Sequence, residues 1–505
     1  MDIRDETAAE AASDEAELAR FGYKQELKRS LGLFSSFAVA FSYISPSTGI
    51  FTLFALGVTT IGGVFFWSWP LVALGQFIIA LSFAELSSHI PVAGSVYQWS
   101  KHLSNRTHAW FTGWMYLFAG ILTVTAVAVT LPLALIPALD GMGWHMQNNL
   151  SNQRTIAIVF MVIVTLLNIY GVKAVALINN VGVLFEILGM VVFAFILALF
   201  HNHQGVGVIF KTGGVDGTVG LFLVAMFMSL FVIYGFDTAS TLSEETRNPR
   251  KEAPKAVLYS IIGAFIIGGV FIWAILMAIP GTLADGIKNG VGPAAVIDAN
   301  FSNAFATVYL LVVSIAIFIC LLSIQANVMR LCFSMARDDQ LPFSSTLRTV
   351  SPRLHTPWIA CITVTLLAAI PLLQYAGATY LAIAATGLIY LAYFLVGTAI
   401  LRARLNGWPK VEAPFKLGKW GIPVSILGLV WGGSMLINFA WPRAASNPTP
   451  AQTGNLLDFH WAWLNHRPVL WTVAIVIAGV GATYFALVQR KKHGEAPEAA
   501  PISVL

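Results

Sequence analysis

Acidic side chains inside long apolar stretches are the first sign of chemistry in this 505-residue chain. Asp237 and Glu186 each lie in a run of apolar residues long enough to cross a lipid bilayer. A charge at the centre of a bilayer costs ~2.5–3.5 kcal/mol on insertion scales, so an acid there faces the protein interior and marks a functional site. Such an acid can hold a proton, contact a cation or accept hydrogen bonds from its neighbours.

A proline and a glycine interrupt the first long apolar stretch, in the segment Ser45-Pro46-Ser47-Thr48-Gly49. Pro46 lacks a backbone N–H and clashes with the preceding helical turn, and Gly49 weakens the turn that follows. One interpretation is a simple proline kink. The other is a discontinuous helix whose free N–H groups point at an anionic substrate group. The segment makes Ser45, Ser47, Thr48 and Gly49 candidate substrate-binding residues.

A second interruption, Tyr234-Gly235-Phe236-Asp237, lies in the middle of another apolar stretch. Gly235 weakens the helix there. Asp237 either caps the second half of a broken helix or contacts a cationic substrate group or a proton. Phe231, one turn earlier, is either a packing residue or a gate over the substrate. Phe231, Tyr234, Gly235 and Asp237 complete the candidate substrate-binding set.

Two further polar features have a structural and a functional interpretation each. Glu186 shares one helical face with three small or polar residues, Asn179, Gly182 and Gly189, so that face is expected to pack inward. Glu186 is either a structural carboxylate with hydrogen-bond partners or a protonatable group that couples an ion to transport. Arg330 is either a snorkelling residue at a solvated helix end or part of a cytoplasmic gate.

The composition requires a membrane to position these residues. The chain is 57% hydrophobic and 10% charged, whereas a soluble domain carries about 25% charged residues. The apolar runs are too long and too continuous for barrel strands, so an all-α integral membrane protein is predicted. Twelve transmembrane helices are expected, at 32–57, 64–88, 108–138, 155–171, 179–200, 219–244, 256–280, 303–335, 357–374, 379–402, 421–441 and 468–489.

The distribution of Lys and Arg predicts the orientation. An even number of spans puts both termini on one side, and 24 of the 29 basic residues then fall on that side and 5 on the other. The positive-inside rule makes that side cytoplasmic, in a cell (plasma or inner) membrane. This asymmetry also accounts for the net charge of +5, so no nucleic-acid partner is needed. Residues 1–30 are expected to form a disordered, acidic cytoplasmic tail, and 490–505 a second cytoplasmic tail.

Interruptions in the first and sixth predicted spans indicate two inverted repeats of five helices. The predicted core covers 31–405, and 406–489 would add two extra helices. The sequence has no GxxxxGK[ST], HExxH or CxxC motif, and its three cysteines lie in or near apolar runs. We therefore expect no enzymatic activity, no cofactor and no metal site.

Four motifs, in order, resemble the amino acid/polyamine/organocation superfamily of permeases. Residues 84–103 are similar to its helix 2–3 loop pattern P-x-A-G-G-x-Y-x-W, with Ser95 in place of the second glycine. Residues 49–51 resemble the end of its helix 1 glycine motif, 234–257 its helix 6 end and E-E-x-x-N-P signature, and 335–342 its helix 8 end. Within the superfamily, SPSTGIF at 45–51, the SEET ending of the helix 6 segment and the spacing between Arg330 and ARDDQLP at 336–342 look most like the amino acid/choline transporter branch.

The resemblance implies the five-plus-five inverted repeat of the leucine-transporter fold. It also implies that a substrate carboxylate meets helix 1 amides near Ser47, Thr48 and Gly49. The substrate ammonium would meet helix 6 carbonyls near Tyr234 and Phe231, and Phe231 aligns with an aromatic gate. Some proton-coupled relatives carry a lysine in helix 5 where this chain has Glu186, so the coupling ion is a proton or, alternatively, sodium.

The expected function is secondary active import of amino acids or related amines, such as 4-aminobutyrate, by alternating access. One rival is a choline or polyamine transporter, in which Tyr43, Phe231, Tyr234 and Phe236 would form an aromatic cage. The other is a nutrient receptor that binds without transporting, although the short tails leave no room for a large signalling domain.

Overall fold

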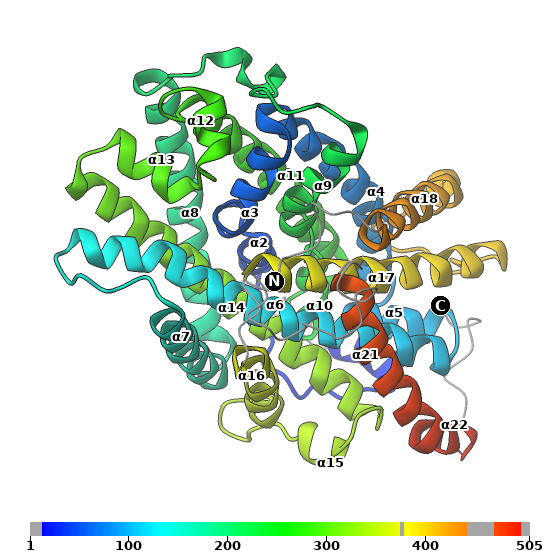
Figure 1. Cartoon of the computed structure of the whole chain (residues 1–505). Helices are drawn as coiled ribbons and strands as arrows, with labels where there is room; N and C mark the ends of the chain where they lie inside the picture. Colours follow the sequence, from blue (N-terminus) through cyan, green and yellow to red (C-terminus); the bar gives the residue numbers. More distant parts are fainter. Residues whose placement is uncertain (1–12, 374–377, 442–468, 496–505) are drawn as a thin grey trace, which may run out of the picture.

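The computed structural model describes residues 13–373, 378–441 and 469–495, and helices occupy every predicted span (Figure 1). The long helices are α2 (Leu33–Ile44), α3 (Pro46–Ile61), α4 (Ser68–His89), α6 (Arg106–Gly141), α7 (Leu150–Tyr170), α8 (Val172–Phe200), α9 (Val219–Val232), α11 (Pro249–Met277), α14 (Asn303–Arg337), α16 (Trp358–Leu373), α17 (Ala378–Leu405), α18 (Gly421–Ala440) and α21 (Val469–Tyr484). Short helices and turns connect them: η1 (Gly62–Trp67), α5 (Ser95–Leu103), η2 (Val206–Phe210), α10 (Thr238–Thr241), η3 (Ser243–Glu245), α12 (Leu283–Lys288), α13 (Pro293–Asn300), α15 (Ser344–Leu347), η4 (Gly418–Trp420), η6 (Phe485–Gln489) and α22 (Arg490–Glu495).

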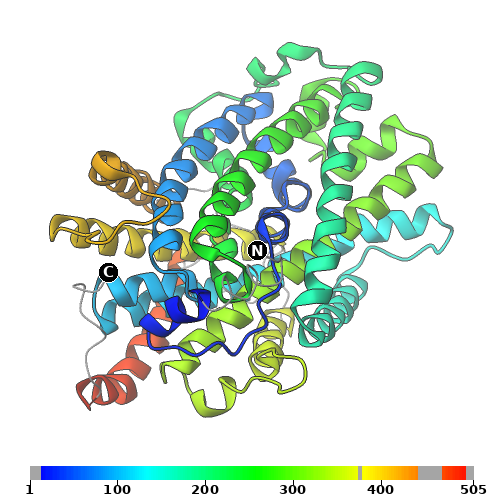
Figure 2. The same cartoon turned by 180° about the vertical axis from the view of Figure 1, so that it is seen from behind.

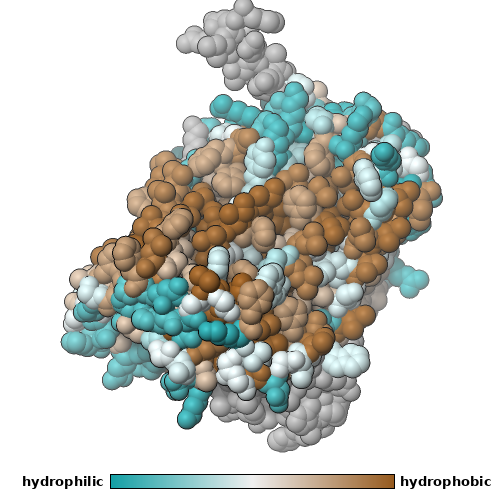
Figure 3. All heavy atoms as spheres, turned by 90° about the horizontal axis from the view of Figure 1, so that it is seen from above, coloured by the Kyte–Doolittle hydropathy of each residue, from teal (hydrophilic) through white to brown (hydrophobic). Residues whose placement is uncertain are grey.

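The surface of the molecule is suited to lipid. Eight helical stretches of the described chain are long and apolar enough to cross a membrane, and α9 and α16 are shorter apolar helices. Large apolar side chains such as Leu74, Leu188 and Leu366 are more than 60% exposed. Figure 3 shows these apolar side chains as a broad belt between hydrophilic patches. Exposing so much apolar surface to water is unfavourable, so the chain is an all-helical, multi-pass membrane protein.

The broken helices lie in the middle of the molecule, where α6, α14 and α17 pass them (Figures 1 and 2). Glycine permits a close approach of α6 and α14: a Cβ at Gly120 of α6 would lie 2.5 Å from Val328 of α14. Figure 1 shows α15 and α22 at one end of the molecule and α12 and α13 at the opposite end. We call the end that carries the N-terminal segment, α5, α15 and α22 the basic end.

The predicted disorder of the N-terminal tail is wrong for residues 13–30. Residues 13–20 are helical, and the side chains of Leu18, Tyr23 and Leu27 are buried. These apolar side chains, at intervals of four or five residues, provide the burial that the acidic composition concealed. Residues 1–12 and 496–505 of the predicted tails lie outside the described residues, as does 442–468 of the predicted segment 406–489.

Candidate functional site

The first predicted interruption is a complete break between α2 and α3. Ser45 has φ 35° and lies in the left-handed region, which ends α2. Pro46 begins α3, a position where its missing N–H costs nothing because the first amides of a helix have no partner within it. The simple proline kink is therefore excluded. The N-terminus of α3, with its partial positive charge, lies in the middle of the molecule.

The second interruption separates α9 from α10. Helix α9 ends at Val232, and Gly235 has φ 87°, a left-handed conformation that favours glycine. Asp237 stands at the N-cap position of α10, but its side chain makes no capping hydrogen bond. The capping interpretation of Asp237 is therefore wrong, because its carboxylate is bound elsewhere.

The structure brings the two breaks face to face. A Cβ at Gly235 would lie 1.9 Å from Cδ1 of Tyr43, the residue two positions before Ser45. Likewise, a Cβ at Gly49 would lie 2.2 Å from Cγ2 of Val232. Only glycine permits these contacts, so both glycines are needed where the broken helices cross. The positive end of α3 and the carbonyl end of α9 thus lie together in one region.

Aromatic side chains pack against one another where the two breaks meet. The Tyr234 ring packs edge-on against Tyr43, at 6.1 Å between centroids, and against Phe231, at 6.0 Å. All three are at least 95% buried. Phe236, the fourth residue of the expected cage, packs instead against Phe83 and Tyr393. The cage hypothesis is therefore wrong for Phe236, because the φ of Gly235 turns the next side chain away from Tyr234.

Glu186 of α8 binds the break between α2 and α3. Its Oε1 accepts hydrogen bonds from Ser45 Oγ at 2.7 Å, Ser47 Oγ at 2.6 Å and the Ser47 N–H at 3.3 Å. Ser45 Oγ also lies 2.7 Å from Thr48 Oγ1. A carboxyl group at a helix N-terminus is favoured by the helix dipole. The Ser47 amide, expected to hold a substrate carboxylate, thus already has an acceptor from the protein itself.

Asp237, two residues after Gly235, lies among three hydroxyl groups. It accepts hydrogen bonds from Tyr116 at 2.6 Å, from Ser95 at 3.0 Å and from Tyr393. The Tyr393 hydroxyl also accepts the Gly235 N–H at 3.1 Å, so it fixes the break directly. Sequence reasoning missed Tyr116, Tyr393 and Ser95. Nothing local distinguishes them from other residues of their helices, because their role depends on which helices meet.

Arg330 is not a snorkelling residue. Its side chain is 1% exposed, and its guanidinium binds both carboxylate oxygens of Glu245, with Nη2 2.9 Å from Oε2. Two turns further along α14, Arg337 binds both carboxylate oxygens of Glu244, at 2.8 and 3.1 Å. Buried charges persist only when they are paired in this way. These two ion pairs join α14 to η3, between the break and the basic end.

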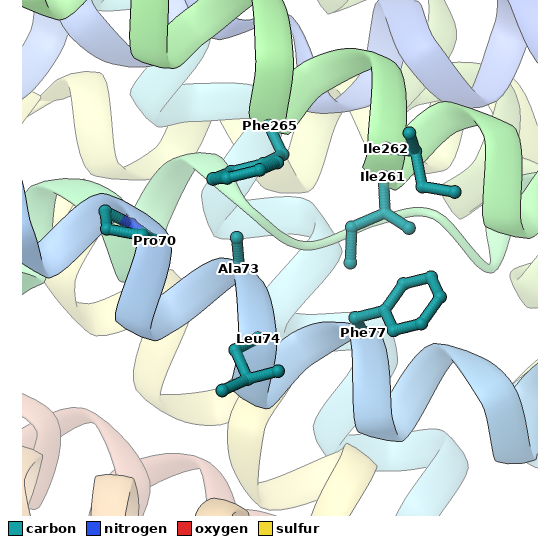
Figure 4. Close-up of a pocket in the computed structure, with 7 residues that line it drawn as sticks. All are labelled: Pro70, Ala73, Leu74, Phe77, Ile261, Ile262 and Phe265. Atoms are coloured by element: carbon teal, nitrogen blue, oxygen red, sulfur yellow. The ribbon is translucent and has the colours of Figure 1, made fainter.

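Two hollows open on the apolar face of the molecule. Figure 4 shows one of about 280 Å³, whose walls come from α4 and α11 and include Leu74, Ile262 and Phe265. Its lining is entirely apolar, so it offers a polar substrate no hydrogen bond. The other, of about 410 Å³, lies between α8 and α14, and its only polar lining residue is Glu186. Neither hollow offers a polar ligand the helix ends that meet at the two breaks.

Comparison with known proteins shows which family the chain resembles. The amino acid permease family profile matches residues 31–457. Amino-acid permease BAT1 of Arabidopsis thaliana is 29% identical over 88% of this chain and 91% of its own length. The rice BAT1 homologue is 27% identical over 87% and 91%, respectively. Branched-chain amino acid permease BcaP of Bacillus subtilis is 29% identical over 67% and 73%.

The matched region contains both broken helices, Glu186 and the paired arginines of α14. It covers more than half of the chain and confirms the superfamily predicted from the four motifs, while the choice of branch stays a prediction. The chain therefore belongs to the amino acid permease family.

Proposed function

We propose that this permease imports amino acids or related amines, such as 4-aminobutyrate, by secondary active transport with alternating access. The observation that carries the proposal is the pair of broken helices that meet at Tyr43–Gly235 and Gly49–Val232. Breaks in corresponding spans are where transporters of this kind bind their substrates. The printed names of relatives, which include a branched-chain amino acid permease, support this substrate class. A permease moves its substrate without converting it, so the chain is not an enzyme.

The proposed architecture is a twelve-span, leucine-transporter type fold. Residues 31–405 form the core, with α2–α8 and α9–α17 as two inverted five-span repeats, and 406–489 adds two spans. The breaks in the first span of each repeat support this symmetry. Both termini face the cytoplasm, because 24 of the 29 Lys and Arg residues lie in the termini and in the loops on the same side of the predicted spans.

The substrate is proposed to lie between the two helix ends. Its carboxylate is held by the N-terminus of α3 at Thr48, beside Ser45, Ser47 and Gly49, although the Gly49 N–H already donates to Ser45 O at 3.2 Å. Its ammonium is held by carbonyl groups at the end of α9 near Phe231, Tyr234 and Gly235. Opposite dipole ends in one space suit a zwitterion, because each end stabilises one of its charges. Asp237 acts on the substrate only indirectly: it binds the Tyr393 hydroxyl, which in turn holds the Gly235 N–H at the break.

Coupling is proposed to run through Glu186. As a carboxylate it competes with the substrate carboxylate for the positive end of α3, to which Ser47 already binds it. A proton on Glu186 removes that negative charge and favours substrate binding, so proton and substrate travel together. Sodium is the alternative ion, since Glu186, Ser45 and Ser47 also offer oxygen ligands.

The cytoplasmic gate is proposed to be the pair Arg330–Glu245. Its bidentate, buried contact joins α14 to the segment that follows the second break. A path from the substrate to the basic end must separate these elements, and breaking a buried ion pair is costly unless both partners regain water.

A choline or polyamine transporter is the second candidate. The rings of Tyr43, Phe231 and Tyr234 pack together and favour a cationic ligand. Choline lacks a carboxylate, however, and would leave the N-terminus of α3 without its partner. A receptor that binds without transporting is the alternative of another class.

Uptake by the purified protein in liposomes tests the function. The panel holds amino acids, 4-aminobutyrate, choline and putrescine, each with an imposed pH or sodium gradient. We expect saturable uptake of amino acids that an inward proton gradient accelerates. Competition of this uptake by choline would favour the second candidate. Binding without uptake would favour the receptor, and sodium-driven uptake indifferent to pH would exclude proton coupling.

Glu186→Gln tests the coupling role. Its uptake should lose the response to a pH gradient, while exchange of labelled for unlabelled substrate persists. Glu85→Gln is the matched control, because Glu85 is also fully buried but pairs with Arg404, away from the breaks. This control should lower stability and keep the pH response. A Glu186→Gln protein that still follows the pH gradient would remove Glu186 from the coupling role.

A further inference from the structure

The N-terminal segment, residues 13–32, crosses the basic end of the molecule before it enters α2. Figure 2 shows it in dark blue, running along this end. Leu18, Leu27 and Leu31 are each at most 3% exposed, and Tyr23 is 9% exposed. Burial of these apolar side chains holds the segment in place, because it removes their surface from water.

One end of the segment is attached to the residues that follow the second break. Leu31 pairs with Thr246 in a parallel β-bridge, and the N–H groups of Ser30 and Leu31 donate to Glu245 O at 2.8 and 2.9 Å. Arg29 donates to Thr246 O at 2.8 Å. This attachment ties the start of α2 to η3 and α11, so the two broken helices share one anchor.

The middle of the segment is attached, through Tyr23, to α5 and the end of α14. Its first residues, like its last, contact the start of α11: the Asn248 N–H donates to Asp14 at 3.0 Å, and Arg250 lies 3.7 Å from Glu17. The Tyr23 hydroxyl donates to Asp338 at 2.9 Å and accepts from Lys101 at 2.7 Å and Gln98 at 3.0 Å. These three bonds use the full capacity of a phenol hydroxyl. The Arg337 guanidinium lies 3.8 Å from the centre of the Tyr23 ring. Tyr23 therefore joins the segment to both α5 and the end of α14 through its hydroxyl group.

Asp338 provides the charge that holds this second attachment. Burial raises the pKa of its carboxyl group, but the Lys101 ammonium and hydrogen bonds from Lys101, Tyr97 and Tyr23 bring the pKa below its ordinary value. Asp338 is thus ionised at neutral pH, and a hydrogen bond to a charged acceptor is stronger than one between neutral groups.

The two attachments join the segment to different elements: one to η3 and α11, the other to α5 and the end of α14. Two ion pairs, Glu245–Arg330 and Glu244–Arg337, also join η3 to α14. If this end opens, as the proposed alternating access requires, η3 must part from α14. The segment then has to release one of its attachments. The attachment at Tyr23 is made by side chains alone, whereas the one at Leu31 includes backbone hydrogen bonds.

We propose that residues 13–32 are a latch on the gate at the basic end, and that Tyr23 is the residue that closes it. The inference rests on the proposed function only for its consequence in transport. Release of the Tyr23 hydroxyl allows α2 and η3 to move away from α5 and α14 as one body, with the Leu31–Thr246 bridge intact. Tyr23 acts as a positioning residue, which holds Asp338, Lys101 and Arg337 in the closed arrangement.

The first test measures gate opening without transport. A reporter, Ser240→Cys, is placed on α10 in a chain whose Cys320, Cys332 and Cys361 are replaced by alanine, because the buried Ser240 hydroxyl has no hydrogen-bond partner to lose. Tyr23→Phe should raise the rate of thiol labelling in detergent at least about tenfold, because it removes three hydrogen bonds, and the one to the charged Asp338 alone accounts for a factor of this size. An unchanged labelling rate would overturn the proposal.

The second test locks each attachment in liposomes. Phe21 and His102 have ring centroids 5.2 Å apart, so Phe21→Cys with His102→Cys can be joined by a short, reducible bis-methanethiosulfonate. This link should stop uptake until dithiothreitol is added. The matched link, Leu31→Cys with Thr246→Cys, lies within one body and should leave uptake unchanged. Uptake through the fully formed 21–102 link would refute the latch. Absent uptake in the untreated wild type would instead refute the proposed function, while the labelling test still decides the latch.

Discussion

At the scale of single residues, Tyr393 controls the shape of the second break. Its hydroxyl is shared between the Asp237 carboxylate and the Gly235 N–H. We predict that Tyr393→Phe lowers the free energy of unfolding by ~1–3 kcal/mol, because two buried polar groups lose a partner. Uptake should fall as well, since the carbonyl end of α9 is no longer fixed. Thermal unfolding in detergent and initial uptake rates measure the two effects.

Tyr380→Phe is the control for that change. Tyr380 lies on the same helix, α17, is 5% exposed, and its buried hydroxyl has no hydrogen-bond partner. Removing this hydroxyl therefore leaves no group unpaired and should change neither stability nor uptake appreciably. Equal effects of the two substitutions would mean that Tyr393 acts by packing, and the assignment of its hydroxyl would be wrong.

At the scale of helices, the crossing of the two broken helices depends on Gly235. A methyl group there would lie 1.9 Å from the Tyr43 ring, which is 3% exposed and packs against the Tyr234 ring. We predict that Gly235→Ala abolishes uptake and lowers the unfolding temperature sharply. The left-handed φ costs ~1–2 kcal/mol for a residue with a Cβ, and overpacking costs about 1–3 kcal/mol more.

Gly214→Ala distinguishes the cost of the left-handed backbone from the cost of overpacking. Gly214 has φ 88°, almost the same as Gly235, but nothing lies within 4 Å of a Cβ built there. Gly214→Ala should therefore show only the cost of the backbone conformation and keep uptake near the wild-type rate. If both variants lose the same stability, the contact with Tyr43 contributes nothing and the helices do not need to cross so closely.

Sequence predicted the features of the helices that depend on local chemistry. Pro46 and Gly235 mark both breaks, because proline and glycine disrupt a helix wherever they lie. The partners of the buried acids were not predictable in this way. That Glu186 reaches Ser47, or that Asp237 meets Tyr116, depends on how α8 and α6 pack, and no spacing along the chain reports it. The acidic composition of residues 13–30 predicts disorder, whereas the spacing of Leu18, Tyr23 and Leu27 lets their side chains be buried and gives the segment a fixed structure.

At the scale of the whole molecule, the orientation in the membrane decides what the gate and latch do. A latch at the basic end controls release into the cytoplasm only if that end is inside, as the distribution of Lys and Arg predicts. The opposite orientation would place the same contacts at the entrance for external substrate. Charge asymmetry biases the insertion of spans because basic loops are retained on the cytoplasmic side.

Cysteine labelling in intact cells determines this orientation. Asn289, beside α12, and Ser345, in α15, are exposed and lie at opposite ends of the molecule (Figure 1). The three native cysteines are buried, so they add little background. We predict that a membrane-impermeant maleimide labels Asn289→Cys in intact cells and Ser345→Cys only after permeabilisation. The reverse pattern would put the basic end outside, and the latch would then govern substrate entry instead of release.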